Sequence, residues 1–180
     1  MRKLKNEELG RKSVDEFKSS EKIPLLIVMD NVRSLNNIGS IFRTADAFLL
    51  EGIYLCGITA APPHREIHKT ALGATDTVSW KYFKETTDAI NDLKREGYTV
   101  IAIEQAEQSI PLDKFIPDIN KKYAVIFGHE INGIADQVMP LVDACIEVPQ
   151  AGYKHSLNIA VCAGIVAWHF FTRYMRTHKT

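Results

Sequence analysis

Residues 148–171, VPQAGYKHSLNIAVCAGIVAWHFF, begin as a polar loop and end as a long apolar run. Ser156 stands just before that run, and serine is a preferred residue at helix N-termini. We therefore expect a helix over residues 156–176 with Ser156 as its cap. The loop before it contains Gly152 and His155, a mixture that a simple connection does not require. The stretch is therefore either a plain lead into a helix or one wall of a binding site.

The composition is typical of a single soluble globular domain. The chain has 180 residues, of which 46% are hydrophobic and 24% are charged, and about 100–200 residues per domain is the usual range. Lys plus Arg number 22 and Asp plus Glu also number 22, so the formal net charge is zero. This balance gives no support for a strongly basic nucleic-acid binder, although it permits a local basic patch.

The cysteines and the N-terminus indicate a cytoplasmic protein. Cys56, Cys145 and Cys162 are far apart and odd in number, which argues against a disulfide framework and favours a reducing compartment. No apolar run reaches the roughly 18 residues of a membrane helix. Residues 1–22 are charged and lack the apolar segment of a signal peptide. We expect them to form an arm or helix, with residues 23–180 as one domain.

Short apolar runs alternate along the chain with amphipathic segments. The runs predict buried strands at residues 24–30, 52–58, 98–104, 122–128 and 144–148. Helical patterns lie at residues 40–50, 67–73, 87–97, 136–141 and 156–176. This alternation predicts an α/β domain with a mostly parallel sheet that helices cover on both faces.

The polar residues that follow the strands indicate where a ligand binds, because such sheets bind ligands at the carboxyl ends of their strands. Three strand exits, residues 31–43, 128–133 and 149–158, are dense in Asn, Gly and charged side chains. Two others, residues 59–66 and 105–112, look like ordinary connectors. We therefore expect the first three to meet at one site.

Several common site types are absent or weak. The first strand is not followed by a glycine-rich dinucleotide fingerprint, and the chain contains no P-loop, which argues against a Rossmann-type nucleotide enzyme. The segment HREIH, residues 64–68, resembles a zinc motif, but its Glu66 is misplaced and a solvated helix face explains the two histidines better. Ser156 and His155 could belong to a catalytic triad, but the sequence has no G-x-S-x-G elbow.

Four single residues allow both a structural and a functional interpretation. Arg43 lies among apolar residues, so it either extends its charged group to solvent or grips an anion such as phosphate. Glu130 stands between two glycines and is either a solvated turn residue or part of a ligand site. Asn37 and Asn158 are typical of caps and turns as well as of sites. Each residue alone is a weak signal.

The ordered combination is much more specific. The segments NVRSLNNIGSIFRTADAF (residues 31–48), VIFGHEINGI (125–134) and residues 148–171 resemble the three motifs of the SpoU (TrmH-like) RNA 2′-O-methyltransferases of the SPOUT superfamily. The resemblance implies an α/β domain with a C-terminal deep trefoil knot. It also implies S-adenosylmethionine as cofactor, tRNA or rRNA as substrate, and a homodimer whose active sites use both subunits.

The resemblance also assigns roles to individual residues. The matched catalytic positions are Arg43, Asn37, Glu130, Ser156 and Asn158, and the matched cofactor-binding positions are Gly128, Val148, Gly152 and Leu157. Three residues depart from the family pattern: Gln150 replaces the common Met, Ala160 replaces Ser, and Leu49 replaces a turn Gly. These departures concern the shape of the cofactor pocket and leave every proposed catalytic group in place.

The implied chemistry needs positioning and help with one proton. A sulfonium leaving group requires no acid and no metal. Arg43 either shares the proton transfer with an RNA phosphate or stabilises the developing alkoxide, because arginine normally keeps its own proton. A non-catalytic, ribosome-associated RNA-binding module is the alternative function.

Two features concern partners. The last helix has more apolar residues than one sheet can cover, which predicts a dimer interface; they are Ile159, Cys162, Ile165, Val166, Trp168, Phe170 and Phe171. Cationic residues near both ends of the chain either contact RNA phosphates or are solvated; they are Arg2, Lys3, Lys5, Arg11, Lys12, Arg173, Arg176 and Lys179.

Overall fold

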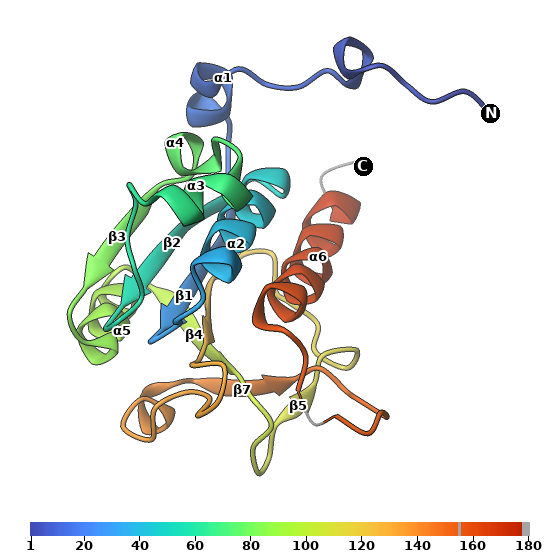
Figure 1. Ribbon diagram of the computed structural model, residues 1–180. Helices are drawn as coiled ribbons and strands as arrows, with labels where there is room; N and C mark the ends of the chain where they lie inside the picture. Colours follow the sequence, from blue (N-terminus) through green and yellow to red (C-terminus); the bar gives the residue numbers. More distant parts are fainter. Residues whose placement is uncertain (155, 178–180) are drawn as a thin grey trace.

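The sheet is parallel and central to the fold (Figure 1). The computed structural model describes residues 1–154 and 156–177, so His155 and Lys179 lie outside the described residues. Seven strands follow the order β3-β2-β1-β6-β4-β7-β5, and every pairing between them is parallel. The strands are β1 (Ile23–Asp30), β2 (Leu50–Cys56), β3 (Trp80–Phe83), β4 (Tyr98–Ile103), β5 (Ile110–Pro111), β6 (Lys122–Phe127) and β7 (Ala144–Glu147).

Helices cover both faces of this sheet. The helical elements of the chain are η1 (Asn6–Leu9), α1 (Val14–Ser19), α2 (Leu35–Ala47), α3 (Arg65–Ala71), α4 (Ala74–Thr77), α5 (Thr86–Arg95), η2 (Met139–Leu141) and α6 (Ile159–Thr177). Residues of α2, α3 and α6 share one apolar core with the sheet, and residues of α5 share the other. The predicted α/β fold, with a mostly parallel sheet between helices, is therefore confirmed.

Strand β1 shows why the central strands are uniformly apolar. Leu25, Ile27 and Met29 belong to the core beneath α2 and α6, whereas Leu26 and Val28 belong to the core beneath α5. Successive side chains point to opposite faces of a strand, so a strand with helices on both sides buries every residue. Each buried aliphatic side chain contributes roughly 1.5–3 kcal/mol to folding.

Helix α3 lies directly on α2 because Gly39 lacks a side chain. A Cβ atom at Gly39 would lie 2.0 Å from Oγ1 of Thr70 and 2.3 Å from the carbonyl oxygen of Ile67. The Thr70 hydroxyl donates a hydrogen bond to the carbonyl of Asn36 at 3.2 Å. This close approach fixes the position of α3 relative to α2.

The last helix begins later than the sequence predicted. Helix α6 starts at Ile159, and Oδ1 of Asn158 accepts the N–H of Ala160 at 2.9 Å and of Val161 at 3.4 Å. Asn158 therefore caps α6, and the prediction that Ser156 caps it is wrong. Asparagine caps as well as serine, and Asn158 stands directly before the apolar run. Figure 1 shows α6 beside α2 on the same face of the sheet.

Other helix boundaries also differ from the predictions. Helix α2 starts at Leu35 because the hydroxyl of Ser34 accepts the N–H of Asn37 at 3.3 Å. The helix predicted to end at Gly73 ends at Ala71 as α3, because Leu72 and Gly73 have left-handed backbone angles, φ 50° and 92°. The segment at residues 136–141 forms only the short η2.

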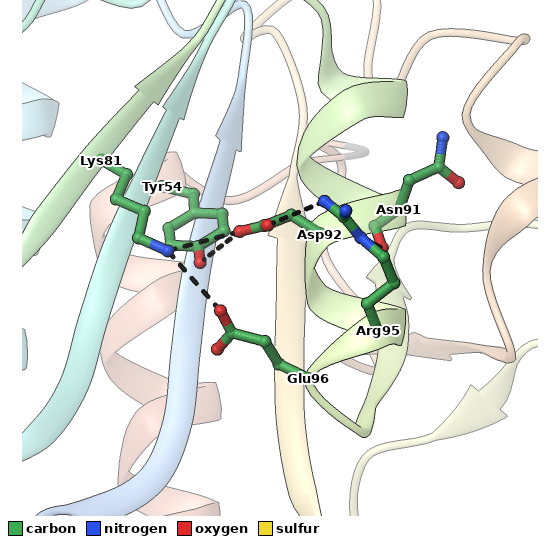
Figure 2. Close-up of polar contacts among 6 residues, drawn as sticks. All are labelled: Tyr54, Lys81, Asn91, Asp92, Arg95 and Glu96. Atoms are coloured by element: carbon green, nitrogen blue, oxygen red, sulfur yellow. Dashed lines mark hydrogen bonds and ion pairs between the residues drawn. The ribbon is translucent and has the colours of Figure 1, made fainter.

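A polar cluster fixes α5 to the strands that it covers (Figure 2). The Tyr54 hydroxyl donates to Oδ2 of Asp92 at 3.0 Å, and Nζ of Lys81 lies 3.4 Å from the same oxygen. Arg95 contacts Oδ1 of Asp92 at 3.1 Å, and Lys81 also reaches Glu96 at 3.6 Å. Burial opposes ionisation, but the Tyr54 hydroxyl and Lys81 outweigh it and lower the pKa of Asp92. Asp92 is thus the common partner that joins β2, β3 and α5.

The N-terminal residues extend away from the body of the protein (Figure 1). Within α1, Phe17 is buried in the core shared with α2, whereas its neighbours are largely exposed. In the part of the chain that the structure describes, no helix has the length and apolar character needed to cross a bilayer.

Candidate functional site

A cleft of about 570 Å³ lies at the carboxyl ends of β4, β6 and β7. Its lining comes from the last residue of each of these strands and from the segment that follows it: Ile103, Glu104 and Gln105 for β4; Phe127, Gly128, His129, Glu130, Ile131 and Gly133 for β6; and Glu147, Val148, Gln150, Ser156, Leu157, Asn158, Ile159 and Cys162 for β7. The exit after β4 was predicted to be an ordinary connector, and this prediction is wrong. The composition of that loop did not indicate a site, because only Glu104 and Gln105 of the loop reach the cleft.

Glu130 connects the exit of β6 to the exit of β1. Its carboxylate accepts the backbone N–H groups of Arg33 at 3.1 Å and Ser34 at 2.9 Å, and the side-chain amide of Asn37 at 3.4 Å. Partial burial raises the pKa of Glu130, but these donors outweigh burial and the pKa lies below its usual value. The carboxylate is therefore ionised at neutral pH, at the N-terminal end of α2, where negative charge is favoured.

Asn158 extends this connection to the exit of β7. Its Nδ2 donates to Oδ1 of Asn37 at 3.1 Å, while its Oδ1 caps α6. Glu130, Asn37 and Asn158 thus form one hydrogen-bonded series that joins the starts of α2 and α6. Ser156 is exposed at the wall of the cleft. Four of the five predicted catalytic residues therefore lie together.

Arg43 does not belong to this group within one chain. It is exposed, and it lines a separate hollow of about 520 Å³ with Ser40, Thr44, Ala47, Phe48, Lys69 and Thr70. Six residues separate it from Asn37 on α2, a rise of about 9 Å along the helix axis. In residues 1–154 and 156–177, Arg43 has no ion-pair partner.

The predicted cofactor positions differ in their relation to the cleft. Val148, Leu157 and Gly128 line it. A Cβ atom at Gly128 would lie 2.2 Å from the backbone of Gly133 and Ile134, so the loop's own closure already requires glycine there. Gly152 is exposed, lies outside the cleft lining, and an added Cβ would meet no heavy atom within 4 Å.

Two carboxylates that the sequence analysis did not single out hold the loop carrying Glu130. Oε2 of Glu104 accepts the N–H of Ile134 at 3.2 Å, and Oδ2 of Asp30 accepts the N–H of Ala135 at 3.0 Å. Asp30 ends β1 and Glu104 follows β4, the two strands that flank β6. An acidic residue at the end of an apolar strand was the available signal for both.

The HREIH segment has a structural explanation. Nδ1 of His64 accepts the N–H of Glu66 at 3.2 Å and caps α3. In the described part of the chain, no group of three or more His, Cys, Asp or Glu residues is arranged to hold a metal ion.

The sequence matches the family described as SpoU rRNA Methylase over residues 24–168. The chain belongs to this family. The resemblance seen in the three motifs is therefore confirmed, and with it the methyltransferase class. Leu49 has a positive φ of 53° at the position where the family pattern has a turn glycine, which accounts for that preference.

Two curated relatives have similar identity. The tRNA (guanosine(18)-2′-O)-methyltransferase of Thermus thermophilus is 27% identical over 159 residues, which are 88% of this chain and 80% of the relative. The 23S rRNA (guanosine-2′-O-)-methyltransferase of Nitrosomonas europaea is 28% identical over 150 residues, 83% of this chain and 56% of the relative.

Solved structures of related proteins share the fold. The TrmH/SpoU tRNA modifying enzyme of A. aeolicus superposes with a TM-score of 0.81 at 20% identity, covering 92% of this chain and 82% of that one. The AdoMet-bound rRNA methyltransferase of Sinorhizobium meliloti gives a TM-score of 0.76 at 27% identity, covering 93% of this chain and 61% of that one.

Proposed function

We propose that this methyltransferase transfers the methyl group of S-adenosylmethionine to a ribose 2′-hydroxyl of tRNA or rRNA. The observation that carries the proposal is the hydrogen-bonded series of Glu130, Asn37 and Asn158, which joins three strand exits beside one cleft. The names of the Thermus and Nitrosomonas relatives specify a guanosine ribose in tRNA and in 23S rRNA, so both RNA classes stay open for this chain.

The cleft fits S-adenosylmethionine in size and in charge. A volume of about 570 Å³ suits a small-molecule ligand. Glu104, Glu130 and Glu147 line the cleft, and no Lys or Arg does so among the described residues, which suits a cofactor with a sulfonium and an ammonium group. When bound, the cofactor supplies an electrophilic methyl group whose transfer leaves a neutral thioether. We assign the adenine and ribose to the backbone around Gly128, Val148 and Leu157.

The residues around the cleft position the reacting groups. Ionised Glu130 holds the first turn of α2, and Asn158 holds the first turn of α6, so the two helix starts stay in a fixed relation. Ser156 borders the cleft. In the sequence it lies between the loop that contains Gly152 and the start of α6. We assign that loop to the methionine part of the cofactor, which requires it to move toward the cleft on binding.

Arg43 supplies the remaining function, stabilisation of the ribose oxygen as its proton leaves. A guanidinium keeps its own proton, so it acts electrostatically, and the proton of the 2′-hydroxyl passes to a nearby RNA phosphate or to water. Because Arg43 lies outside the cleft of its own chain, we propose that it serves the cleft of a second subunit.

An apolar stripe on α6 supports the homodimer that this arrangement needs. Val161, Ile165 and Trp168 follow one another at helical spacing and are 52%, 38% and 55% exposed. Trp168 also contacts Phe48, which borders the hollow of Arg43. Ile159, Val166 and Phe170, which were expected to contribute to this surplus, are instead buried within their own chain. We propose that a twofold interface over the stripe brings Arg43 of each subunit to its partner's cleft.

Three further expectations accompany the proposal. Strand β7 lies three positions from β1 in the sheet, yet α6 packs on α2 and β1, which supports the C-terminal trefoil knot. Residues 1–22 act as an arm on the catalytic domain at residues 23–180. Three free cysteines support a cytoplasmic location.

The direct test maps ribose methylation in RNA. Unmodified tRNA and rRNA are incubated with the protein and S-adenosylmethionine, and 2′-O-methylated positions are read against a Glu130→Ala control. We expect a discrete new ribose methylation in one RNA class that the control lacks. RNA binding without any methyl transfer would instead establish the non-catalytic module, and methylation of bases would contradict the proposed acceptor.

A further inference from the structure

Helix α3 presents a cationic face to solvent. Arg65, His68, Lys69 and Leu72 are exposed and recur at helical spacing, whereas Ile67 and Ala71 on the other side of the helix are buried. Residues at this spacing share one face of a helix. We call the surface formed by Arg65, His68, Lys69 and the nearby Trp80 the α3 face.

Two hollows flank α3, and the side chain of Lys69 borders both. One is the hollow of about 520 Å³ that contains Arg43. The other has about 600 Å³ and is lined by Pro62, Pro63, His64, Arg65, Ile67, His68, Lys69, Thr75, Asp76 and Trp80. Lys69 therefore links the hollow of the proposed catalytic arginine to the hollow that contains the exposed Trp80.

The charges of this surface favour an anion. Arg43, Arg65 and Lys69 line the two hollows, against the single carboxylate of Asp76. In the described residues Arg65 has no ion-pair partner, and Lys69 pairs with Glu66 at 2.8 Å on an exposed surface. Exposed pairs of this kind contribute little, so Lys69 can exchange Glu66 for a phosphate.

The surface is also held in place before any ligand arrives. The close contact of Gly39 with Thr70 and Ile67 sets α3 on the helix that carries Arg43. Trp80 belongs to β3, which pairs with β2, and the residue is 37% exposed. The Trp80 ring and the α3 cations are thus both held in position. This arrangement suits single-stranded nucleic acid, whose phosphates pair with the cations while a base stacks on the ring.

We propose that the α3 face binds single-stranded RNA next to the nucleotide that is methylated. Arg65 and Lys69 contact flanking phosphates, and Trp80 stacks with an unpaired base. Stacking on a side chain requires a base that is free of its helix, so loops and single strands fit and duplex RNA does not. This inference rests on the proposed function, because it places the RNA strand relative to Arg43, the proposed catalytic residue.

The test measures RNA affinity of the full chain by fluorescence anisotropy at several salt concentrations, with unmodified bulk tRNA and a labelled 12-nucleotide oligoadenylate as probes. The variants are Arg65→Gln/Lys69→Gln, Trp80→Leu and Trp80→Phe. Lys94→Gln/Lys122→Gln is the control with an equal loss of charge at positions away from the α3 face. Calorimetry of S-adenosylmethionine binding checks that each variant folds.

We expect Arg65→Gln/Lys69→Gln to lower the salt dependence of binding, by roughly 0.7 in the logarithmic slope for each lost phosphate contact. Trp80→Leu is expected to weaken oligoadenylate binding about fivefold or more, and Trp80→Phe to restore most of it, because a base stacks on either ring. Cofactor affinity stays unchanged in all variants. The Lys94→Gln/Lys122→Gln control keeps the wild-type salt dependence of RNA binding.

Two results overturn the inference. If wild type binds RNA and the α3-face variants match it or match the lysine control, RNA binds elsewhere while the proposed function stands. If Trp80→Phe is as weak as Trp80→Leu, the ring does not stack with a base. Failure of wild type to bind either probe would count against the proposed function itself.

Discussion

The carboxylate of Glu130 accepts the backbone N–H of Ser34 at 2.9 Å, although 96 residues separate them in sequence. Ser34 caps α2, so Glu130 holds the start of the helix that carries both Asn37 and Arg43. The loop of Glu130 is held in turn by Glu104 and Asp30. The arrangement of the site therefore depends on one exposed carboxylate and its supports.

Replacing Glu130 with alanine leaves the N–H groups of Arg33 and Ser34 without this acceptor. We expect the free energy of unfolding to fall by about 1–2 kcal/mol and methyl transfer to fall at least about tenfold, because the site loses its alignment. Urea unfolding and a methyl-transfer assay measure the two effects. Glu107→Ala removes an exposed carboxylate from another loop and serves as the control; equal losses in both variants would contradict the role of Glu130.

The contribution of Glu130 to stability depends on pH in a defined direction. Its pKa is lowered in the folded protein, so its contribution is complete above the unfolded carboxyl pKa and is lost as pH falls through the folded value. The stability difference between wild type and Glu130→Gln should stay constant from pH 8 to about 5.5 and shrink below about pH 4. A difference that instead grows on acidification would show that the carboxylate is not held by donors.

Replacing Asn158 is expected to lower the free energy of unfolding more than replacing Ser156. Asn158→Ala removes the cap of α6 and the bond to Asn37, which should cost about 1 kcal/mol or slightly more. Ser156→Ala should change the unfolding free energy by less than about 0.5 kcal/mol. Urea titrations of both variants give the comparison, and a larger loss for Ser156→Ala would restore serine as the cap.

The two glycines that we assign to the cofactor site should also behave differently. Gly128→Ala places Cβ against the backbone of Gly133 and Ile134, so it should destabilise the fold by about 1–3 kcal/mol. Gly152→Trp should leave the unfolding midpoint unchanged and weaken S-adenosylmethionine binding by at least about tenfold, or about 1.4 kcal/mol. Calorimetry that finds full affinity in a well-folded Gly152→Trp would remove this loop from the cofactor site.

Much of the fold could be predicted from the sequence. Buried parallel strands are continuous apolar runs, and their alternation with helices determines the α/β class. Helix starts were less predictable, because Ser34, Ser156 and Asn158 are all acceptable caps and tertiary contacts choose among them. The pairing of Asn158 with Asn37 depends on a contact across 121 residues, which local pattern does not contain.

The site was predicted in part. The three motifs identified Glu130, Asn37 and Asn158, which lie together, and they indicated family and enzyme class. An acidic residue at the end of a strand is a weak signal, and it does not show that Glu104 and Asp30 hold the loop of Glu130. Nor does sequence show that Arg43 lies outside the cleft of its own chain, since that depends on the direction in which α2 leads away from Asn37.

We propose that Arg43 of one subunit completes the cleft of the other. Single-turnover methyl transfer to a mapped RNA site tests it in mixed dimers, in which one subunit carries Arg43→Ala and the other Glu130→Ala. Two affinity tags isolate the mixed species. Each variant alone should lose about 10²–10⁴-fold in rate for Arg43 and at least about tenfold for Glu130, with cofactor affinity of Arg43→Ala unchanged.

In the mixed dimer, one cleft with intact Glu130 faces the intact Arg43 of the partner. We expect methyl transfer to recover at about half of the sites, as a twofold dimer requires, at a rate far above that of Arg43→Ala alone and below wild type only as far as Glu130→Ala loosens the α2 helix that carries the intact Arg43. If Arg43 served its own chain, every site would lack one of the two residues. A stable mixed dimer that binds S-adenosylmethionine but shows no recovery of methyl transfer would contradict the account.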